Sequence, residues 1–538
     1  MPVYLKDLKD LKISLPLPGQ SSHRRSTSEN ASTSSGSFRQ RRSNSIKGAK
    51  KKFLNLPTHS TFWSENTEER SHHLKFHRPH LHRVKTDNST DDEKQYLHVH
   101  QMDNARFRAV KESIKSSISI DQINSLVFST PPKDGFPDVD GDVVVMGGYR
   151  GSILRDAKTK RRVWIPMKVG LNIRRINLEI GLTDEDESRV EEDIIPDGML
   201  KAIGPVDMCS RLIKRLQMNR ECHVHDYGYD WRLSLDKLSM QFVEYLRKLK
   251  SQSASPEKGI IVIAHSMGGV VAHGAMQIDP SLFRGLLYVG APSSSVNILG
   301  PFRNGENVLL STKVLSAQVT FSMRSSFIFL PLDGRCFLDK NTGKEIKLDF
   351  FDASVWEKYG LSPCVARGIQ QKNESTHEKI ADTVAGAAKP ALDEVTAPAG
   401  MSEPPAPNEA KSTLPRAEAV EYLQRTLTRT KEFKHSLMYD LSKNYPPLAI
   451  VYGRTVPTVA GARVFGEKDI YDGDYSDMIF VPGDGVVAAR NIMPPEGFPI
   501  CAKIRSTRGH VGLLGDIVGI GEALDAILQE ENRRKENL

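Results

Sequence analysis

One short segment constrains the fold of this chain more than any other. Residues 259–264 form an almost wholly apolar run, and Ser266 follows within the string Ala-His-Ser-Met-Gly-Gly of residues 264–269. Such a run is typical of a strand in the middle of a parallel sheet, and a helical stretch over residues 270–278 comes directly after it. A sharp strand-to-helix turn requires small residues on both sides of its central serine. The segment therefore predicts a serine hydroxyl that is exposed above a parallel sheet.

Strands and helices alternate on both sides of this segment. Short apolar runs predict strands, and apolar residues that recur every three or four positions predict helices. Because this alternation is the signature of an α/β fold, we predict a mostly parallel sheet. The predicted strands are residues 142–146, 259–264, 285–290, 448–452, 478–482 and 500–505, and the predicted helices are residues 205–218, 235–249, 270–278, 419–433 and 516–528.

The alternation stops between residues 291 and 440. This part begins with loops and aromatic residues, which predict a cap inserted over the sheet, and residues 370–415 are rich in Ala, Pro, Glu and Lys, which predicts a low-complexity insertion. The chain is thus expected to have four parts. These are a disordered basic tail rich in Ser and His (1–125), the first part of the core (126–290), the cap (291–440) and the second part of the core (441–538).

The net charge of +8 belongs to the predicted tail. Residues 1–100 contain 18 Lys and Arg against 10 Asp and Glu, and the remaining 438 residues contain 56 of each kind. An electrically neutral core does not favour nucleic acid as a partner. The tail is either a solubilising extension or an electrostatic switch, in which a kinase modifies serines and so weakens binding to an anionic membrane. The candidate serines are Ser26, Ser28, Ser43 and Ser45.

Histidines, cysteines and hydropathy bear on metal binding and on location. Nine of the sixteen histidines lie within residues 1–100, but they have no cysteine partners and no fixed spacing, so we predict neither a metal site nor a cofactor. Five widely spaced cysteines are typical of a reducing compartment. We find neither the apolar region of a secretory signal in residues 1–17 nor a run of 18 apolar residues. We therefore expect an intracellular protein, either cytoplasmic or peripheral to a membrane.

The residues after Ser266 include partners for a serine nucleophile. Such a nucleophile needs a histidine base and a carboxylate that orients the base, in the order Ser, Asp, His on this kind of fold. Asp484 directly follows a predicted strand, which would bring its carboxylate to the carboxyl edge of the sheet, and His510 lies between the last predicted strand and helix. We predict these three residues as a catalytic triad. The weaker candidates are Asp472, Asp474 and Asp477 for the acid, and His273, His377 and His435 for the base.

The oxyanion of a tetrahedral intermediate needs two backbone N–H donors. Met267, the residue after the nucleophile, is predicted to supply one of them. The glycine-rich turn at residues 147–151 follows the first predicted strand, and its glycines allow the backbone to approach a substrate carbonyl closely. We therefore predict the N–H of Tyr149 as the second donor.

Four segments resemble the lecithin:cholesterol acyltransferase family, which includes phospholipid:diacylglycerol acyltransferases and related phospholipases A. The most specific of them contains the string Tyr-Asp-Trp-Arg. The chain differs from the family at Gly147, where a proline is usual, and in the low-complexity insertion of its cap. In the family's order, the four segments are residues 144–152, 227–233 and 264–269, and residues 448–458, which lead towards Asp484 and His510.

The resemblance implies an α/β hydrolase fold, a lipid acyl donor and an acyl-enzyme on Ser266. It also implies that Tyr229, Asp230, Trp231 and Arg232 line or brace the acyl site. Considered without the resemblance, the same four residues are equally consistent with a structural element in which Asp230 pairs with Arg232.

These features predict a lipid O-acyltransferase. The enzyme would take an acyl group from a glycerolipid or phospholipid and pass it to an alcohol, such as a sterol or diacylglycerol. Two alternatives use the same fold and site: an intracellular phospholipase or lipase with water as the acceptor, and a soluble esterase for small esters. A third, from another class, is an inactive hydrolase fold that serves as a lipid-binding or scaffold protein.

Overall fold

The computed structural model describes residues 136–165, 177–203, 206–308, 311–367 and 412–537 of the chain. The predicted N-terminal tail, with its candidate phosphorylation sites and its histidines, lies outside these residues, as does nearly all of the predicted low-complexity insertion. The predicted roles of both segments therefore stay predictions.

Six strands of the described residues form a central sheet in which all neighbouring strands are parallel. The order is β17-β14-β9-β8-β1-β7, and the sheet confirms the predicted α/β fold. Five of these strands match predicted ones. The edge strand β7 was not predicted, because its string Cys-His-Val-His-Asp-Tyr contains few apolar residues. The strands are β1 (Gly141–Met146), β7 (Cys222–Tyr227), β8 (Ile260–His265), β9 (Phe283–Val289), β14 (Leu448–Gly453) and β17 (Ile500–Ser506).

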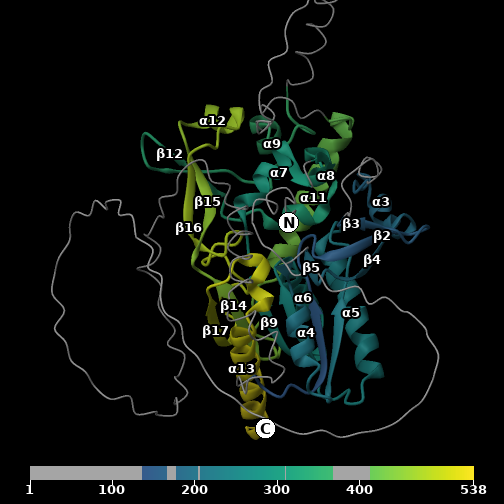
Figure 1. Ribbon diagram of the computed structural model, residues 1–538. Coiled ribbons are helices and arrows are strands. Elements are labelled where there is room, and N and C mark those ends of the chain that lie inside the picture. Colours follow the sequence, from purple (N-terminus) through teal and green to yellow (C-terminus); the bar gives the residue numbers. More distant parts are fainter. Residues whose placement is uncertain (1–135, 166–176, 204–205, 309–310, 368–411, 538) are drawn as a thin grey trace, which may run out of the picture. The chain divides into compact units, whose positions relative to one another are not determined.

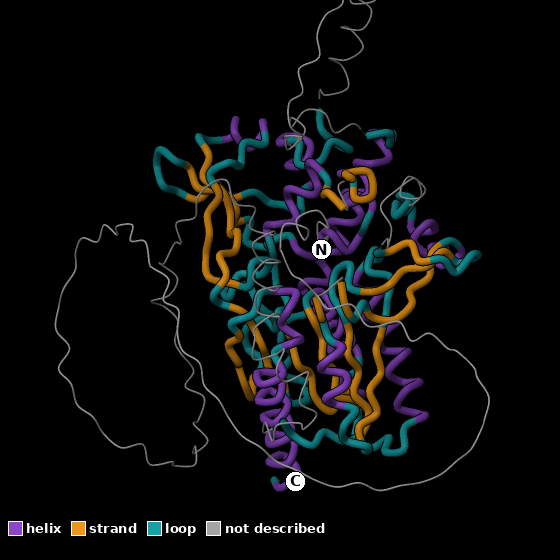
Figure 2. Tube along the Cα trace, viewed as in Figure 1, coloured by secondary structure: helices purple, strands orange, loops and turns teal. Residues whose placement is uncertain are grey.

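Helices cover both faces of this sheet (Figures 1 and 2). Successive side chains of a strand point to opposite faces, so in β1 Val144 and Met146 join one core while Val143 and Val145 join the other. The first core includes α5 and α6, and the second includes α4 and α13. Every residue of β8 is buried, which explains its unbroken apolar run. The helices are α4 (Ser210–Leu216), α5 (Leu235–Gln252), α6 (Met267–Ile278) and α13 (Ile517–Glu536).

The strand before Asp484 belongs to a second sheet rather than to the central one. A strand was predicted at residues 478–482, and β16 does lie there. However, β16 pairs antiparallel with β15 in a sheet of order β13-β12-β15-β16, seen at the upper left of Figure 1. Asp484 therefore does not follow a strand of the parallel sheet, contrary to the prediction. The strands are β12 (Arg335–Asp339), β13 (Glu345–Lys347), β15 (Val456–Val464) and β16 (Met478–Gly483).

The part predicted as a cap contains short helices and strands and one long helix, α11, which lie above the central sheet in Figure 1. Its strands β12 and β13 share the second sheet with β15 and β16, so that sheet crosses the boundary predicted at residue 440. The other elements of this region are η5 (Val296–Ile298), α7 (Leu299–Asn304), β10 (Glu306–Val308), β11 (Ser311–Leu315), α8 (Ala317–Ser322), η6 (Arg324–Phe329), α9 (Ala353–Tyr359) and α11 (Arg416–Ser436). The helix α12 (Glu467–Asp472) follows β15, beyond this region.

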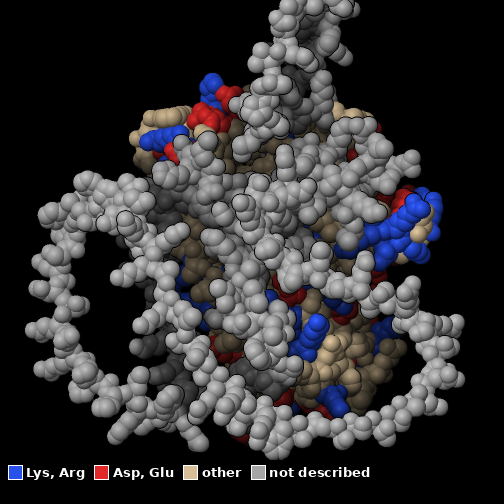
Figure 3. Space-filling view, in the orientation of Figure 1, with Lys and Arg blue, Asp and Glu red and all other residues tan. Residues whose placement is uncertain are grey.

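A third, antiparallel sheet of order β3-β2-β4 follows the glycine-rich turn. The tip of its β2–β3 hairpin exposes Lys158, Lys160 and Arg161, and Figure 3 shows basic side chains gathered there, at the right of the view. Basic residues therefore also gather locally on the neutral core. The remaining elements are β2 (Ser152–Asp156), β3 (Arg162–Trp164), α3 (Asp184–Ser188), η3 (Val190–Glu192), β4 (Ile194–Met199), β5 (Ala202–Ile203), β6 (Val206–Asp207), η4 (Pro280–Leu282) and η7 (His510–Gly515).

A buried lysine joins the helix α11 to two neighbouring segments. Lys434 Nζ donates hydrogen bonds to the carbonyl oxygens of Ser293 and Ile328, at 2.8 Å each. The lysine is 7% exposed, and burial lowers the pKa of its amine from 10.5 to about 7. Two N–H donors are sufficient for these two carbonyls, so the neutral amine fits the site.

The stability of the protein is expected to rise with pH because of Lys434. Between about pH 7 and the usual lysine pKa, the unfolded chain binds a proton that the folded protein excludes. The free energy of unfolding then increases by up to about 1.4 kcal/mol per pH unit from this group. Urea denaturation at several pH values measures how the free energy of unfolding changes with pH. This pH dependence should be smaller for Lys434→Met than for the wild type. Equal slopes would contradict this account.

Candidate active site

Ser266 lies in a strained turn between β8 and α6. Its φ of 55° and ψ of −130° fall in a region that L-residues rarely adopt, and its N–H donates to the carbonyl of Val289 at 2.9 Å. Neighbouring backbone approaches closely: a Cβ on Gly148 would lie 2.4 Å from the Cβ of Ser266, and one on Gly268 would lie 2.3 Å from the Gly147 oxygen. This crowding explains why the sequence has glycines here.

The structure brings Ser266, His510 and Asp484 together. His510 Nε2 lies 3.0 Å from Ser266 Oγ, and His510 Nδ1 lies 2.8 Å from Asp484 Oδ2. All three are buried, with 7%, 5% and 1% exposure respectively. The other carboxylate oxygen of Asp484 accepts hydrogen bonds from the N–H groups of Val486 and Val487, at 2.9 and 2.7 Å. Asp484 is thus fixed by its own loop and directs one oxygen at the imidazole.

The alternative acids lie elsewhere. Asp472 contacts Lys468, Asp474 contacts Ser476, and Asp477 contacts Arg463.

The alternative bases are also engaged elsewhere or lie outside the described residues. The ring of His273 is fully buried between the hydroxyl of Tyr288 and the carbonyl of Leu437. His435 is exposed on α11, and His377 lies outside the described residues. Among the described histidines considered as the base, His510 is the one in contact with Ser266.

No sequence pattern indicated that His265 supports His510. His265 Nε2 lies 2.9 Å from the carbonyl oxygen of His510, and the two rings are 4.8 Å apart. Burial, together with the neighbouring His510, lowers the pKa of His265 to about 3. Since His265 is neutral at ordinary pH, it can donate a hydrogen bond to this carbonyl without placing a second positive charge beside His510.

The predicted oxyanion donors come from two segments that adjoin Ser266, the start of α6 and the glycine-rich turn. Met267 is the first residue of α6, and Tyr149 lies in a turn that is closed by a 2.8 Å hydrogen bond from the Gly151 N–H to the Gly148 carbonyl. The hydroxyl of Tyr149 lies 2.8 Å from Ser326 Oγ, and its ring contacts Phe329 edge to face. The side chain of Tyr149 thus holds the turn in place together with the backbone hydrogen bond.

The four residues predicted to bind substrate lie behind this turn and do not line the cavity at Ser266. Tyr229 donates its hydroxyl hydrogen to the carbonyl of Gly147 at 2.9 Å, and Trp231 Nε1 donates to the carbonyl of Ser152 at 3.2 Å. Arg232 forms a bidentate pair with Asp230, at 2.8 and 2.6 Å. The buried pair of Asp230 and Arg232 is the one that the structural interpretation of the quartet described, and the role of these residues at the acyl site stays a prediction.

A cavity of about 100 Å³ lies directly beside Ser266 and His510. It is smaller than the roughly 300–1,000 Å³ that is usual for ligand pockets, so it accommodates an ester group and a few carbons but not a whole glycerolipid. Among its described lining residues, Arg150 and Glu306 are charged and pair with each other. The other described lining residues include Leu200, Met208, Pro292, Ile298, Phe329 and Val487.

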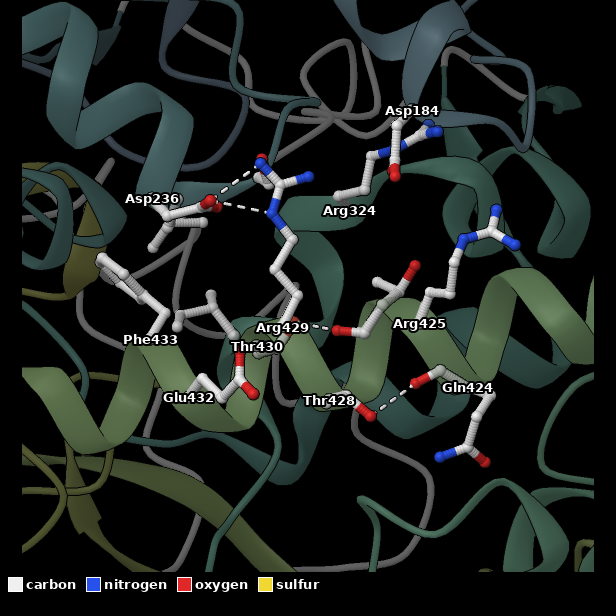
Figure 4. Close-up of a pocket in the computed structure, with 14 residues that line it drawn as sticks. Asp184, Asp236, Arg324, Gln424, Arg425, Thr428, Arg429, Thr430, Glu432 and Phe433 are labelled. Carbon is white, nitrogen blue, oxygen red and sulfur yellow. Dashed lines mark hydrogen bonds and ion pairs between the residues drawn. The ribbon is translucent and has the colours of Figure 1, made fainter.

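A larger cavity of about 370 Å³ lies between α11, η6 and the start of α5 (Figure 4). Arg324, Arg425 and Arg429 line it together with Asp184 and Asp236, and its described lining residues include no histidine or cysteine. Figure 4 shows Arg429 turned towards Asp236, which it contacts at 2.8 Å. Its three arginines pair with carboxylates of the protein, and no histidine or cysteine lines it to act as base or thiol nucleophile, so the smaller cavity is the better candidate for catalysis.

Two further findings concern the described residues. They contain no group of three or more His, Cys, Asp and Glu placed to hold a metal ion. None of their helices combines the length and the apolar character that a membrane crossing requires.

The parallel sheet, the strained serine turn and the flanking helices define an α/β hydrolase. A model of the lecithin:cholesterol acyltransferase family matches residues 210–344. The uncharacterized protein YJR098C of Saccharomyces cerevisiae is 44% identical over 461 residues, which make up 80% of this chain and 70% of the yeast protein. The chain belongs to the lecithin:cholesterol acyltransferase family.

Two solved structures are more distant. A chain of the Tle4–Tli4 complex is 14% identical, and the match covers 73% of this chain and 98% of that one with a TM-score of 0.42. A thioesterase domain from the curacin biosynthetic pathway is 10% identical, with 73% and 92% covered and a TM-score of 0.21.

Proposed function

We propose that the protein is a lipid O-acyltransferase that takes an acyl group from a glycerolipid and passes it to an alcohol. The observation that supports this proposal most directly is the position of His510, whose two ring nitrogens contact Ser266 and Asp484 at the same time. Membership of the lecithin:cholesterol acyltransferase family supports a lipid ester as the substrate.

The first half of the reaction forms an acyl-enzyme. His510 Nε2 accepts the hydroxyl proton of Ser266 while Ser266 Oγ attacks the ester carbonyl, and Asp484 stabilises the resulting imidazolium. The N–H groups of Met267 and Tyr149 hold the oxyanion of the tetrahedral intermediate. When the intermediate collapses, the ester bond to the glycerol oxygen breaks, and His510 returns its proton to that oxygen.

The second half transfers the acyl group. The acceptor hydroxyl loses its proton to His510, and its oxygen attacks the acyl-enzyme carbonyl. Collapse of the second intermediate releases the new ester and returns the proton to Ser266. Water in place of the alcohol gives hydrolysis, so a phospholipase or lipase is the second candidate. Which acceptor reacts depends on how well the site excludes water, and Phe329 and Ile298 contribute apolar surface to the cavity beside Ser266.

The four residues of the Tyr-Asp-Trp-Arg string are proposed to position the oxyanion turn. Tyr229 and Trp231 bind backbone carbonyls at either end of that turn, at Gly147 and Ser152. The buried pair of Asp230 and Arg232 fixes the segment from which both rings project. Their proposed contribution is therefore the placement of Tyr149 rather than direct contact with the lipid.

A donor and acceptor assay tests the proposal. Purified protein is incubated with a phospholipid that is radiolabelled in its acyl chain, either alone or with a sterol or diacylglycerol. We expect labelled sterol ester or triacylglycerol to form with the acceptors present, in excess of labelled free fatty acid. Release of free fatty acid alone under all conditions would assign the hydrolase instead. No acyl release from phospholipid or from neutral glycerolipids by folded protein would exclude both enzymes and favour the lipid-binding alternative.

A further inference from the structure

Arg150 has an unusual backbone conformation in the predicted oxyanion turn. Its φ is 65°, and the other non-glycine residues with positive φ in the described part of the chain are Lys160 and Ser266. Arginine gains nothing from the left-handed region, where its Cβ is crowded, so the conformation persists only if the surroundings impose it. Tyr149 and Arg150 are the two central residues of the turn that the hydrogen bond from the Gly151 N–H to the Gly148 carbonyl closes. The conformation of Arg150 therefore bears on the placement of the Gly148–Tyr149 peptide, which carries the N–H of Tyr149.

Arg150 is held by two contacts of its side chain and one of its backbone. Its guanidinium forms an ion pair with Glu306, the first residue of β10, and the two side chains are 3% and 12% exposed. The Arg150 Cζ atom lies 4.5 Å from the centre of the Tyr149 ring. The backbone is held as well, since Trp164 Nε1 donates to the carbonyl of Arg150 at 2.9 Å.

The ion pair is poorly suited to a purely stabilising role. Arg150 Nε is buried and has no hydrogen-bond partner among the described residues, and buried ion pairs in general add little net stability. Both side chains line the cavity at Ser266. Glu306 belongs to the predicted cap, whereas Arg150 belongs to the core, and 156 positions separate them in the sequence. The pair thus connects the cap to the turn that faces the substrate carbonyl.

We propose that Arg150 and Glu306 are positioning residues for the oxyanion hole. Glu306 holds the arginine side chain, the arginine holds its own backbone in the left-handed region, and the N–H of Tyr149 is thereby directed at the substrate oxygen. The inference rests on the proposed function, because it assumes that Ser266 attacks an ester and that Tyr149 is an oxyanion donor. It adds that the cap contributes to the chemical step through Glu306.

The rate of covalent labelling by a fluorophosphonate measures this effect, because the phosphoryl oxygen of the probe occupies the oxyanion hole. We expect Glu306→Gln and Arg150→Gly each to lower the second-order rate constant about tenfold or more, though less than the roughly 100- to 1,000-fold that follows loss of a donor. The double variant should be no slower than the slower single variant, because the two residues act as one unit. In ester turnover, kcat should fall while KM changes little.

A matched control separates positioning from stability. Glu531 forms a similar ion pair with Arg284 at the amino end of β9, at 2.8 Å and with side chains that are 11% and 9% exposed. Glu531→Gln should lower the melting temperature and leave the labelling rate unchanged. Labelling of Glu306→Gln at the wild-type rate, or a loss no larger than that of Glu531→Gln, would overturn the proposal.

Labelling of the wild-type protein distinguishes failure of the proposed function from failure of the positioning role. If the folded wild-type protein is not labelled at Ser266, the proposed function fails. If it is labelled and the Arg150 and Glu306 variants match it, the proposed function stands and the positioning role is wrong.

Discussion

Replacement of Ser266 by alanine is expected to lower acyl release about a million-fold and to abolish covalent labelling by a fluorophosphonate. The hydroxyl is the proposed nucleophile, and His510 lies 3.0 Å from it with no other described hydroxyl at that nitrogen. Alanine keeps the Cβ and the backbone crowding of the turn, so the melting temperature should remain near that of the wild type. The measurements are in-gel labelling, ester turnover and thermal unfolding of the same preparations.

Ser239 offers a matched control for this substitution. It is fully buried, and its hydroxyl donates one hydrogen bond, to the carbonyl of Val271 at 3.1 Å. Ser239→Ala should cost a modest amount of stability and leave labelling and turnover intact. Acyl release that survives in Ser266→Ala would refute the assignment of the nucleophile, whichever lipid is used.

The serine turn could be predicted from the sequence because its determinants are local. An apolar strand, a string of small residues and an apolar helix follow one another within residues 259–278, and each is visible in a short window. His510 could be inferred by elimination, since few histidines follow Ser266. The central sheet was predictable for the same reason, because burial on both faces leaves an unbroken apolar run in strands such as β8.

The pairing of β16 and the supports of the site could not be predicted in this way. The apolar string at residues 478–482 indicates a strand, but the choice between the central sheet and β15 depends on partners far along the chain. The ion pair of Arg150 and Glu306 likewise joins residues whose neighbourhoods show no shared pattern. The Tyr-Asp-Trp-Arg string was recognisable as a motif, yet its position behind the turn follows only from the tertiary contacts of Tyr229 and Trp231.

Replacement of Asp484 by asparagine is expected to lower kcat/KM for ester turnover about 10,000-fold without unfolding the protein. The reason is the orientation of the side chain. Oδ1 accepts two backbone N–H groups, so asparagine must place its amide oxygen there and its NH₂ group against His510 Nδ1. That nitrogen then becomes an acceptor, and the ring proton moves to Nε2. His510 would face Ser266 as a donor, and it could not accept the hydroxyl proton.

Asp474 provides the control, because it was an alternative for the acid in the sequence and its carboxylate contacts Ser476 on the surface. Asp474→Asn should retain wild-type turnover, since no triad residue depends on that carboxylate. If Asp484→Asn stays active while Asp474→Asn is impaired, the acid has been assigned to the wrong loop. If neither substitution lowers turnover, the base works without a carboxylate partner. A carboxylate partner is needed when the imidazole must be held in one tautomer. The contact between Asp484 and His510 Nδ1 is the one that would hold the ring in that tautomer.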